Sequence, residues 1–255
     1  MNKLSIALTA ALLGITAGAC TSQKKANRSQ ARTELGQAYM TEKNDELAIE
    51  TLREATKLDK RNPEAWHTLA MAYMRKGAFE ESEKAFKKAL RRSPDIDASI
   101  LNNYGYMLIK LGRAEEGIEH LEAAREDLTY RKPAILLNSL GFAYLELQQC
   151  DLATARLQEA VTRSPKFCQA WFHLGLANEC SGNSGQALDA FDKVIGTCPE
   201  QAAGAWLQVC SIEQGRGRYA EAIDACEELL MLPDLPNDLL NDVNARLSEM
   251  RVAAQ

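Results

Sequence analysis

Cysteine is the residue type in this sequence with the most available chemistry. The chain of 255 residues has seven cysteines. Cys20 stands alone near the start, and the other six lie between positions 150 and 226. Thiols form thioethers and disulfides or ligate metals, but the Cys-x-x-Cys spacing of many zinc sites does not occur in the sequence. We therefore expect the six distal cysteines to pair as disulfides, and Cys20 to have a separate role.

The other reactive side chains do not predict an enzyme. His67, His120 and His173 are far apart in the sequence, and none is followed by a metal-ligating residue three or four positions later. The sequence has no glycine-rich phosphate loop and no nucleophile elbow. Its many carboxylates fall on predicted helices, where they usually form a solvated face. We expect no catalytic site, no metal and no cofactor.

The first 19 residues are typical of a signal peptide. They contain Lys3, an apolar stretch over residues 4–15 and the small residues Ala17-Gly18-Ala19. A charged start, a short apolar segment and a small-residue cleavage site define such signals. The apolar stretch is also too short to span a bilayer by itself. We expect residues 1–19 to be removed on export.

The residue after this segment, Cys20, resembles the lipobox cysteine of bacterial lipoproteins. In that family the thiol carries lipid, palmitate included, and several acyl chains anchor the protein durably. The alternative is an ordinary signal peptide followed by an unmodified cysteine. Thr21 implies the outer membrane, because many lipoproteins retained at the inner membrane have Asp there. We expect residues 20–30, rich in Ser, Gln and Lys, to be a lipidated N-terminus and a flexible tether.

The charge balance argues against a nucleic-acid partner. Without residues 1–19, the chain has 29 Lys and Arg against 35 Asp and Glu, a net charge of −6. A mildly acidic chain of this kind lacks the basic character that nucleic-acid binding requires. Beyond Cys20, no apolar run is long enough for a transmembrane helix. We therefore expect a domain in water that contacts the membrane through its lipid anchor alone.

The rest of the chain repeats one motif six times. The clearest copy has the residue order of a tetratricopeptide repeat: Trp66, Leu69, Ala70, Tyr73, Phe86, Ala89 and Pro94. Aligned copies start near residues 29, 63, 98, 134, 168 and 203. Each repeat predicts a helical hairpin that is stable only when stacked on its neighbours. The predicted fold is all-α: a superhelical solenoid of six hairpins over residues 31–235, with a capping helix and tail over 236–255.

Small residues at two places in the repeat set the geometry of each hairpin. Those at the eighth position let the second helix approach closely: Gly36, Ala70, Gly105, Gly141 and Gly175. Those between the two helices are expected to turn the chain: Gly77, Gly112, Gly182 and Gly217.

The first helices of the hairpins are expected to line a concave groove. In the middle repeats their predicted exposed face is apolar and aromatic, with two Asn side chains one repeat apart, which favours binding of a peptide. The predicted binding residues are Asn102, Tyr106, Asn138, Phe142, Phe172 and Leu176. Two alternatives stay open. Some of these side chains pack against the next hairpin, or the partner binds the first two repeats around Met40, Met71 and Met74.

One local motif narrows the function. The stretch Leu101-Asn102-Asn103-Tyr104-Gly105, followed by an acidic helix and then by Tyr130-x-x-Pro133, resembles the six-repeat type IV pilus biogenesis lipoproteins of the PilF, PilW and Tgl family. The resemblance implies a pilotin on the periplasmic face of the outer membrane, which binds pilus secretin subunits and promotes their insertion and multimerisation. The alternative is a general periplasmic tetratricopeptide scaffold lipoprotein in envelope machinery. We expect a monomer.

The repeat alignment also predicts how the distal cysteines pair. The two helices of a hairpin are antiparallel. When residues are numbered from the start of their repeat, the numbers of two residues that face each other across the hairpin therefore always add up to the same value. Cys168 and Cys198 satisfy this rule in repeat five, and Cys210 and Cys226 satisfy it in repeat six. The remaining two cysteines lie at the same edge of neighbouring hairpins. The predicted disulfides are Cys150–Cys180, Cys168–Cys198 and Cys210–Cys226, the alternative being that some of these cysteines are small buried core residues.

Overall fold

The computed structural model is helical nearly throughout. It describes residues 3–127 and 129–254, with side chains described from residue 21 onward. The described residues form thirteen α-helices and one short 3-10 helix, and they contain no strand. The α-helices are α1 (Lys3–Thr41), α2 (Asp45–Leu58), α3 (Pro63–Arg75), α4 (Phe79–Leu90), α5 (Ala98–Lys110), α6 (Ala114–Arg125), α7 (Pro133–Glu146), α8 (Cys150–Arg163), α9 (Cys168–Cys180), α10 (Ser184–Thr197), α11 (Ala202–Gly215), α12 (Tyr219–Leu230) and α13 (Asn237–Ala253).

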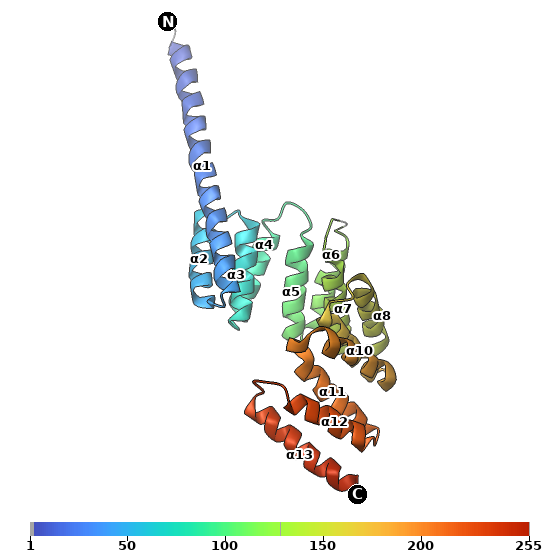
Figure 1. Cartoon of the computed structure of the whole chain (residues 1–255). Helices are drawn as coiled ribbons and strands as arrows, with labels where there is room; N and C mark the ends of the chain where they lie inside the picture. Colours follow the sequence, from blue (N-terminus) through green and yellow to red (C-terminus); the bar gives the residue numbers. More distant parts are fainter. Residues whose placement is uncertain (1–2, 128, 255) are drawn as a thin grey trace. The chain divides into compact units, whose positions relative to one another are not determined.

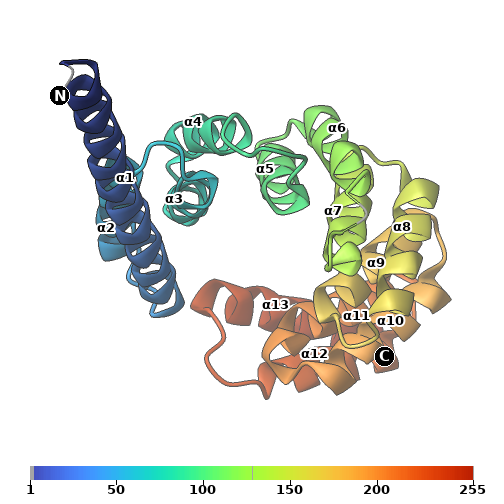
Figure 2. The same cartoon turned by 90° about the horizontal axis from the view of Figure 1, so that it is seen from above.

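The chain forms two compact units, each made of stacked helical hairpins (Figures 1 and 2). Unit 1 extends to Met107, within α5, and unit 2 begins at Leu108. In unit 1, α1 packs on α2 and α3 packs on α4, and the two pairs pack on each other. In unit 2, the pairs α7–α8, α9–α10 and α11–α12 stack in order. The all-α tetratricopeptide fold predicted from the sequence is confirmed.

The turns within the hairpins depend on residues with positive φ. Four of them are the predicted glycines, with φ between 73° and 76°: Gly77, Gly112, Gly182 and Gly217. In the first and fourth repeats the equivalent residues are Lys43 and Gln148, with φ of 59° and 57°. An L-residue tolerates this conformation at some cost. The same backbone turn therefore recurs at one position of the repeat, with or without glycine.

The small residues at the eighth position bring the helices of a hairpin together. Gly141 lies against Leu157, and a Cβ added to it would approach Leu157 Cδ2 to 2.7 Å, well inside van der Waals contact. Gly175 lies against Phe191 in the same way. Leu157 and Phe191 are both fully buried. The large side chain of the second helix thus fills the space that the glycine leaves.

The last helix, α13, covers the apolar face of α12. Its buried residues Val243, Leu247 and Met250 belong to one cluster with Cys226 and Leu229. Without this helix, the last hairpin would expose its apolar side to water. This is the segment from which the sequence analysis expected a cap.

Residues 21–30 are helical, which differs from the flexible tether expected from their composition. They belong to α1. Ser29 holds the segment in place, because its Oγ donates a hydrogen bond to the Ala55 carbonyl (2.9 Å) and accepts one from Asn62 Nδ2 (3.1 Å). The segment has no Gly or Pro, and extending a helix already held by packing costs little. The prediction of a flexible tether, which was made from the low apolar content, therefore differs from the structure.

The predicted signal peptide, residues 1–19, and Cys20 lie outside the residues whose side chains the structure describes. Within the described part of the chain, no helix has the length and apolarity needed to cross a membrane.

The six distal cysteines are joined in the three predicted pairs, all in unit 2. The Cα atoms of Cys150 and Cys180 are 5.6 Å apart, and this disulfide links hairpin α7–α8 to hairpin α9–α10. The other two disulfides each close one hairpin, with Cα separations of 6.4 Å for Cys168–Cys198 and 5.4 Å for Cys210–Cys226. Each bond restricts the unfolded chain more than the folded one, and so stabilises unit 2.

We predict that loss of the second disulfide destabilises the protein. The double variant Cys168→Ser, Cys198→Ser should lower the free energy of unfolding by about 3 kcal/mol, because the unfolded chain regains the entropy of a 30-residue loop. Urea unfolding measures this value. Non-reducing peptide mapping of periplasmic protein should show all three bonds, and free thiols at Cys150 and Cys168 would contradict the scheme.

We also predict that Gly141→Ala destabilises the protein by about 1–3 kcal/mol, because the added methyl group overpacks the buried Leu157. Gly185→Ala is the matched control: Gly185 lies in α10, and an added Cβ there has no atom within 4 Å. The control should be neutral or stabilising by up to about 1 kcal/mol through helix propensity. Equal melting temperatures for the two variants would contradict the packing argument.

Candidate partner-binding surfaces

The six residues predicted to bind a partner fall in both units. Asn102 and Tyr106 lie on α5 in unit 1. The other four lie on α7 and α9 in unit 2: Asn138, Phe142, Phe172 and Leu176. The structure therefore describes them as two separate sets.

In unit 2, Asn138 is part of a buried polar cluster. Only 3% of its surface is exposed, and its Oδ1 lies 2.9 Å from Nδ1 of His173. The His173 ring stacks on Phe142, with centroids 5.0 Å apart, and Lys110 Nζ lies 4.9 Å from the centroid of the Phe142 ring. The prediction that Asn138 is exposed is therefore wrong. His173, one repeat further along the chain, contacts the amide oxygen of Asn138 in a buried site.

The protonation state of His173 fits this structural role. Burial, followed by the positive charge of Lys110, lowers the pKa of His173 to about 4. The imidazole is therefore neutral at neutral pH, and its Nδ1–H can donate to Asn138. Protonation would place a charge on a residue of which only 8% is exposed, beside the positive charge of Lys110.

Phe172 and Leu176 pack against the neighbouring hairpins. Phe172 meets Phe191 edge to face, with ring centroids 5.5 Å apart. Both Phe172 and Leu176 are half-buried and join the cluster that contains Ala205 and Ile212 of α11. This agrees with the alternative prediction, in which apolar residues of the first helices pack against the next hairpin.

In unit 1, the two neighbouring asparagines of α5 have different environments. Asn102 is 4% exposed, and its Nδ2 makes only a long hydrogen bond, 3.4 Å, to Asn103 Oδ1. Asn103 faces α3 instead: its Nδ2 lies 2.9 Å from His67 Nε2 and 3.4 Å from Met71 Sδ. Tyr106 is half-buried. Asn102 was predicted to bind a partner, whereas Asn103 is the asparagine that contacts two residues lining a cavity, His67 and Met71.

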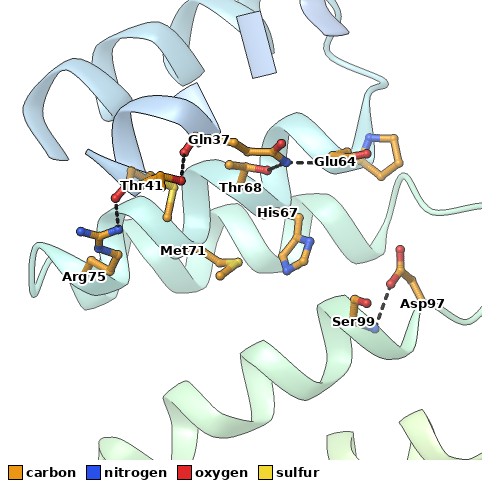
Figure 3. A pocket seen from close by; sticks show the side chains of 11 residues that line it. Gln37, Thr41, Glu64, His67, Thr68, Met71, Arg75, Asp97 and Ser99 are labelled. Carbon is orange, nitrogen blue, oxygen red and sulfur yellow. Dashed lines mark hydrogen bonds between the residues drawn. The ribbon is translucent and has the colours of Figure 1, made fainter. Parts of the chain in front are cut away.

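That cavity lies in unit 1, between the C-terminal part of α1, the face of α3 and the start of α5 (Figure 3). Its volume is about 570 Å³. The lining includes Met40, which the sequence analysis named as part of an alternative site, and Met71; Met74, the third residue named there, is not among the lining residues. Pro63 and eight polar side chains complete the walls: Gln37, Thr41, Glu64, His67, Thr68, Arg75, Asp97 and Ser99.

Hydrogen bonds hold the polar walls of the cavity in place. Gln37 Nε2 donates to Glu64 Oε1 (3.1 Å) and to Thr68 Oγ1 (3.4 Å), which ties α1 to α3. Arg75 donates to the Met40 carbonyl and also forms an ion pair with Asp45. The guanidinium of Arg75 therefore already has two partners within the protein. A cavity with two methionines and a fixed amide suits an apolar side chain presented on a polar backbone.

His67 is one of the titratable groups that line this cavity. Burial lowers its pKa, and the negative charges of Asp97 and Glu64 oppose that shift. A neutral His67 accepts the hydrogen bond that Asn103 donates. Around the two methionines, the lining therefore combines uncharged side chains with the carboxyl groups of Glu64 and Asp97 and the guanidinium of Arg75. Among the described residues, no group of three or more His, Cys, Asp and Glu side chains could hold a metal ion.

Helical spacing in the sequence could have identified more of the residues that line this cavity. Arg75 follows Met71 by four residues, and so lies on the same face of α3. Glu64 and Thr68 lie one turn apart on the neighbouring stripe of that helix. Asn103 could not be found in this way, because its contact depends on how α5 packs beside α3.

Comparison with known proteins supports the repeat assignment and adds relatives. Models of the tetratricopeptide repeat match residues 36–77, 63–96, 98–124 and 139–207. The type IV pilus assembly protein PilF of Pseudomonas aeruginosa is 30% identical over 125 residues, which cover 48% of this chain and 49% of that protein. The chain thus spans about half the length of this curated relative.

Two solved structures resemble the chain over most of its length. The crystal structure of PilW, a widely conserved type IV pilus biogenesis factor, has a TM-score of 0.78 and 26% identity, and covers 84% of this chain and 98% of that chain. A structure of Pseudomonas aeruginosa PilF has a TM-score of 0.70 and 20% identity, which shows a shared fold, over 88% of this chain and 99% of that chain. The chain therefore belongs to the tetratricopeptide-repeat proteins, and the type IV pilus biogenesis proteins PilF and PilW are its homologues.

Proposed function

We propose that this chain is an outer-membrane lipoprotein that acts as a pilotin. Acyl chains on Cys20 hold it at the periplasmic face of the membrane, where it binds pilus secretin subunits and promotes their insertion and multimerisation. The observation that carries this proposal is the likeness to PilW, which extends over 84% of this chain and 98% of PilW. The lipobox-like segment ending at Cys20 adds independent support.

The role we propose is binding and not catalysis. Tetratricopeptide hairpins bind segments of partner proteins along their first helices. In unit 1 these helices leave a cavity of about 570 Å³ with an amphipathic lining. We propose this cavity, in place of the six residues predicted from the sequence, as the main contact for a secretin segment. The burial of Asn102 and Asn138 supports this choice, because neither amide is displayed to a ligand.

A secretin segment would meet two kinds of group in the cavity. Met40 and Met71 offer flexible apolar surface that adapts to a side chain. The Gln37 amide, fixed by Glu64 and Thr68, offers a hydrogen bond to the backbone of the segment. Such a site favours an extended or helical segment with one large apolar anchor. Residues of this kind usually supply most of the binding energy at an interface.

We predict that Met71→Ala combined with Gln37→Ala weakens binding of purified secretin subunits by about 10- to 100-fold, because an apolar contact and a hydrogen bond are lost together. Isothermal titration calorimetry measures the affinity, and circular dichroism checks the fold. Met74→Ala is the matched control, since Met74 lies on the same helix and does not line the cavity. If Tyr106→Ala with Phe142→Ala abolishes binding while the cavity variant binds normally, the contact involves the residues that were predicted from the sequence.

The anchor has its own test in cells. In a strain that lacks the protein, the wild-type gene should restore secretin multimers in the outer membrane. Cys20→Ser should leave a folded periplasmic protein that cannot bring the secretin to that membrane, because no acyl chain holds it there. Membrane fractionation measures both outcomes. A Cys20→Ser protein that still floats with outer membranes washed at high salt, which removes salt-sensitive contacts, would exclude the lipid anchor. Normal multimers without the protein would favour a general scaffold.

A further inference from the structure

The positive charge of this acidic chain is concentrated in unit 1. Residues 21–107 contain 16 Lys and Arg against 13 Asp and Glu, whereas residues 108–255 contain 13 against 22. The net charges are therefore +3 and −9. Such an asymmetry between halves of a chain points to an anionic surface or partner at the basic half.

Within unit 1, the charge gathers in three segments. Residues 21–32, 57–62 and 87–97 together have eleven Lys and Arg against three Asp and Glu. The remaining residues of the range 21–107 have five against ten. The basic character of the unit thus comes from a minority of its residues.

These three segments lie at one edge of unit 1. The first includes the part of α1 that extends beyond the hairpin, before Ser29. The others contain the loops α2–α3 and α4–α5, which lie at the end of the unit from which α1 extends (Figure 1). Hydrogen bonds join them. Asn62 donates to Ser29 of α1, and Arg92 Nε donates to the Lys60 carbonyl at 3.0 Å. The edge is therefore one continuous surface.

Six basic residues of this edge are exposed and form no ion pair with any described residue. We call them the basic edge: Lys24, Lys25, Arg28, Lys60, Arg61 and Arg91. Other basic residues nearby have a local explanation, because Lys57, Lys87 and Lys88 lie in last turns of helices and complement the helix dipole. Of the basic edge, only Arg91, the C-cap residue of α4, shares this explanation.

The acidic residues of the same edge do not neutralise it. Asp59 accepts the backbone N–H of Arg61, and Asp97 accepts those of Ser99 and Ile100, so both stabilise local turns. Asp95 is exposed in the α4–α5 loop. Beside it, Ile96 is 49% exposed, a large apolar side chain on an otherwise charged surface. Basic residues together with an exposed apolar side chain are typical of surfaces that lie in a membrane interface.

We propose that the basic edge rests on the anionic phospholipid headgroups of the leaflet into which the acyl chains of Cys20 insert. The helical rise of 1.5 Å per residue puts the backbone of Ser29, where the hairpin begins to pack, about 14 Å from that of Cys20. This short span keeps the edge near the headgroups, within about one to two Debye lengths at physiological salt. The orientation rests on the proposed lipid anchor. The electrostatic contact adds a second attachment to the membrane, where the sequence analysis expected the lipid alone.

A vesicle assay tests this contact without lipid anchor or secretin. The protein used is residues 21–255, which contains every side chain described as packed, since the first buried one is Ser29. Circular dichroism confirms its fold. It should float with phosphatidylglycerol vesicles at low salt, and release at high salt, because screening weakens the contact. It should not float with phosphatidylcholine vesicles.

Two variants with the same change in net charge separate a local from a global effect. Lys60→Gln, Arg61→Gln, Arg91→Gln should reduce partition onto phosphatidylglycerol vesicles by at least about tenfold, since each basic residue near such a surface contributes roughly a fivefold factor. The control Lys43→Gln, Lys166→Gln, Lys193→Gln removes three exposed charges elsewhere and should bind nearly as well as the parent.

Three outcomes would overturn the proposal: no binding to phosphatidylglycerol vesicles, equal losses in the two variants, or salt-sensitive self-association without vesicles in the ultracentrifuge. The last result would assign the basic edge to the acidic unit of a second copy. None of these results bears on secretin binding by the cavity, and failure of the pilotin role would leave the vesicle result unchanged.

Discussion

The structure depends on one packing constraint, the close approach of two helices over a residue with little or no side chain. Gly141 beneath Leu157 and Gly175 beneath Phe191 show the arrangement. A large residue of the second helix fills the space, and the hairpin then presents a flat apolar side to the next one. Because a single hairpin cannot bury that side, each repeat stabilises its neighbours. The free energy of folding is thus spread along the chain and not gathered in one central core.

Polar contacts between successive first helices fix how far each helix is offset along the next one, which apolar stacking alone does not determine. Asn103 pairs with His67, and His173 pairs with Asn138, in each case across about one repeat. Both histidines have a lowered pKa because they are buried. A buried amide beside a neutral imidazole is satisfied only at the correct offset of the two helices, so a shift of one turn would leave both groups unpaired.

The fold could be predicted in detail, whereas the binding surface could not. Repeat spacing located the hairpins, the turn glycines and the disulfide partners, because each depends on position within one repeat or between adjacent ones. The exposure of Asn102 and Asn138 depends instead on what the neighbouring first helix presents to them. A histidine 35 residues away buries and satisfies Asn138. The helical state of residues 21–30 was missed for a similar reason, since a contact of Ser29 with α2 holds the segment.

The placement of the disulfides gives the two units different mechanical properties. Unit 1 has no cysteine beyond Cys20, whereas in unit 2 the bonds close residues 150–180, 168–198 and 210–226 into covalent loops. The first two loops overlap, so residues 150–198 cannot be drawn out to their full contour length. A pull applied along the chain would lengthen unit 1 hairpin by hairpin. Within unit 2, residues 150–198 would stay short, because the two overlapping bonds keep helices α8, α9 and α10 within reach of one another and able to refold from nearby.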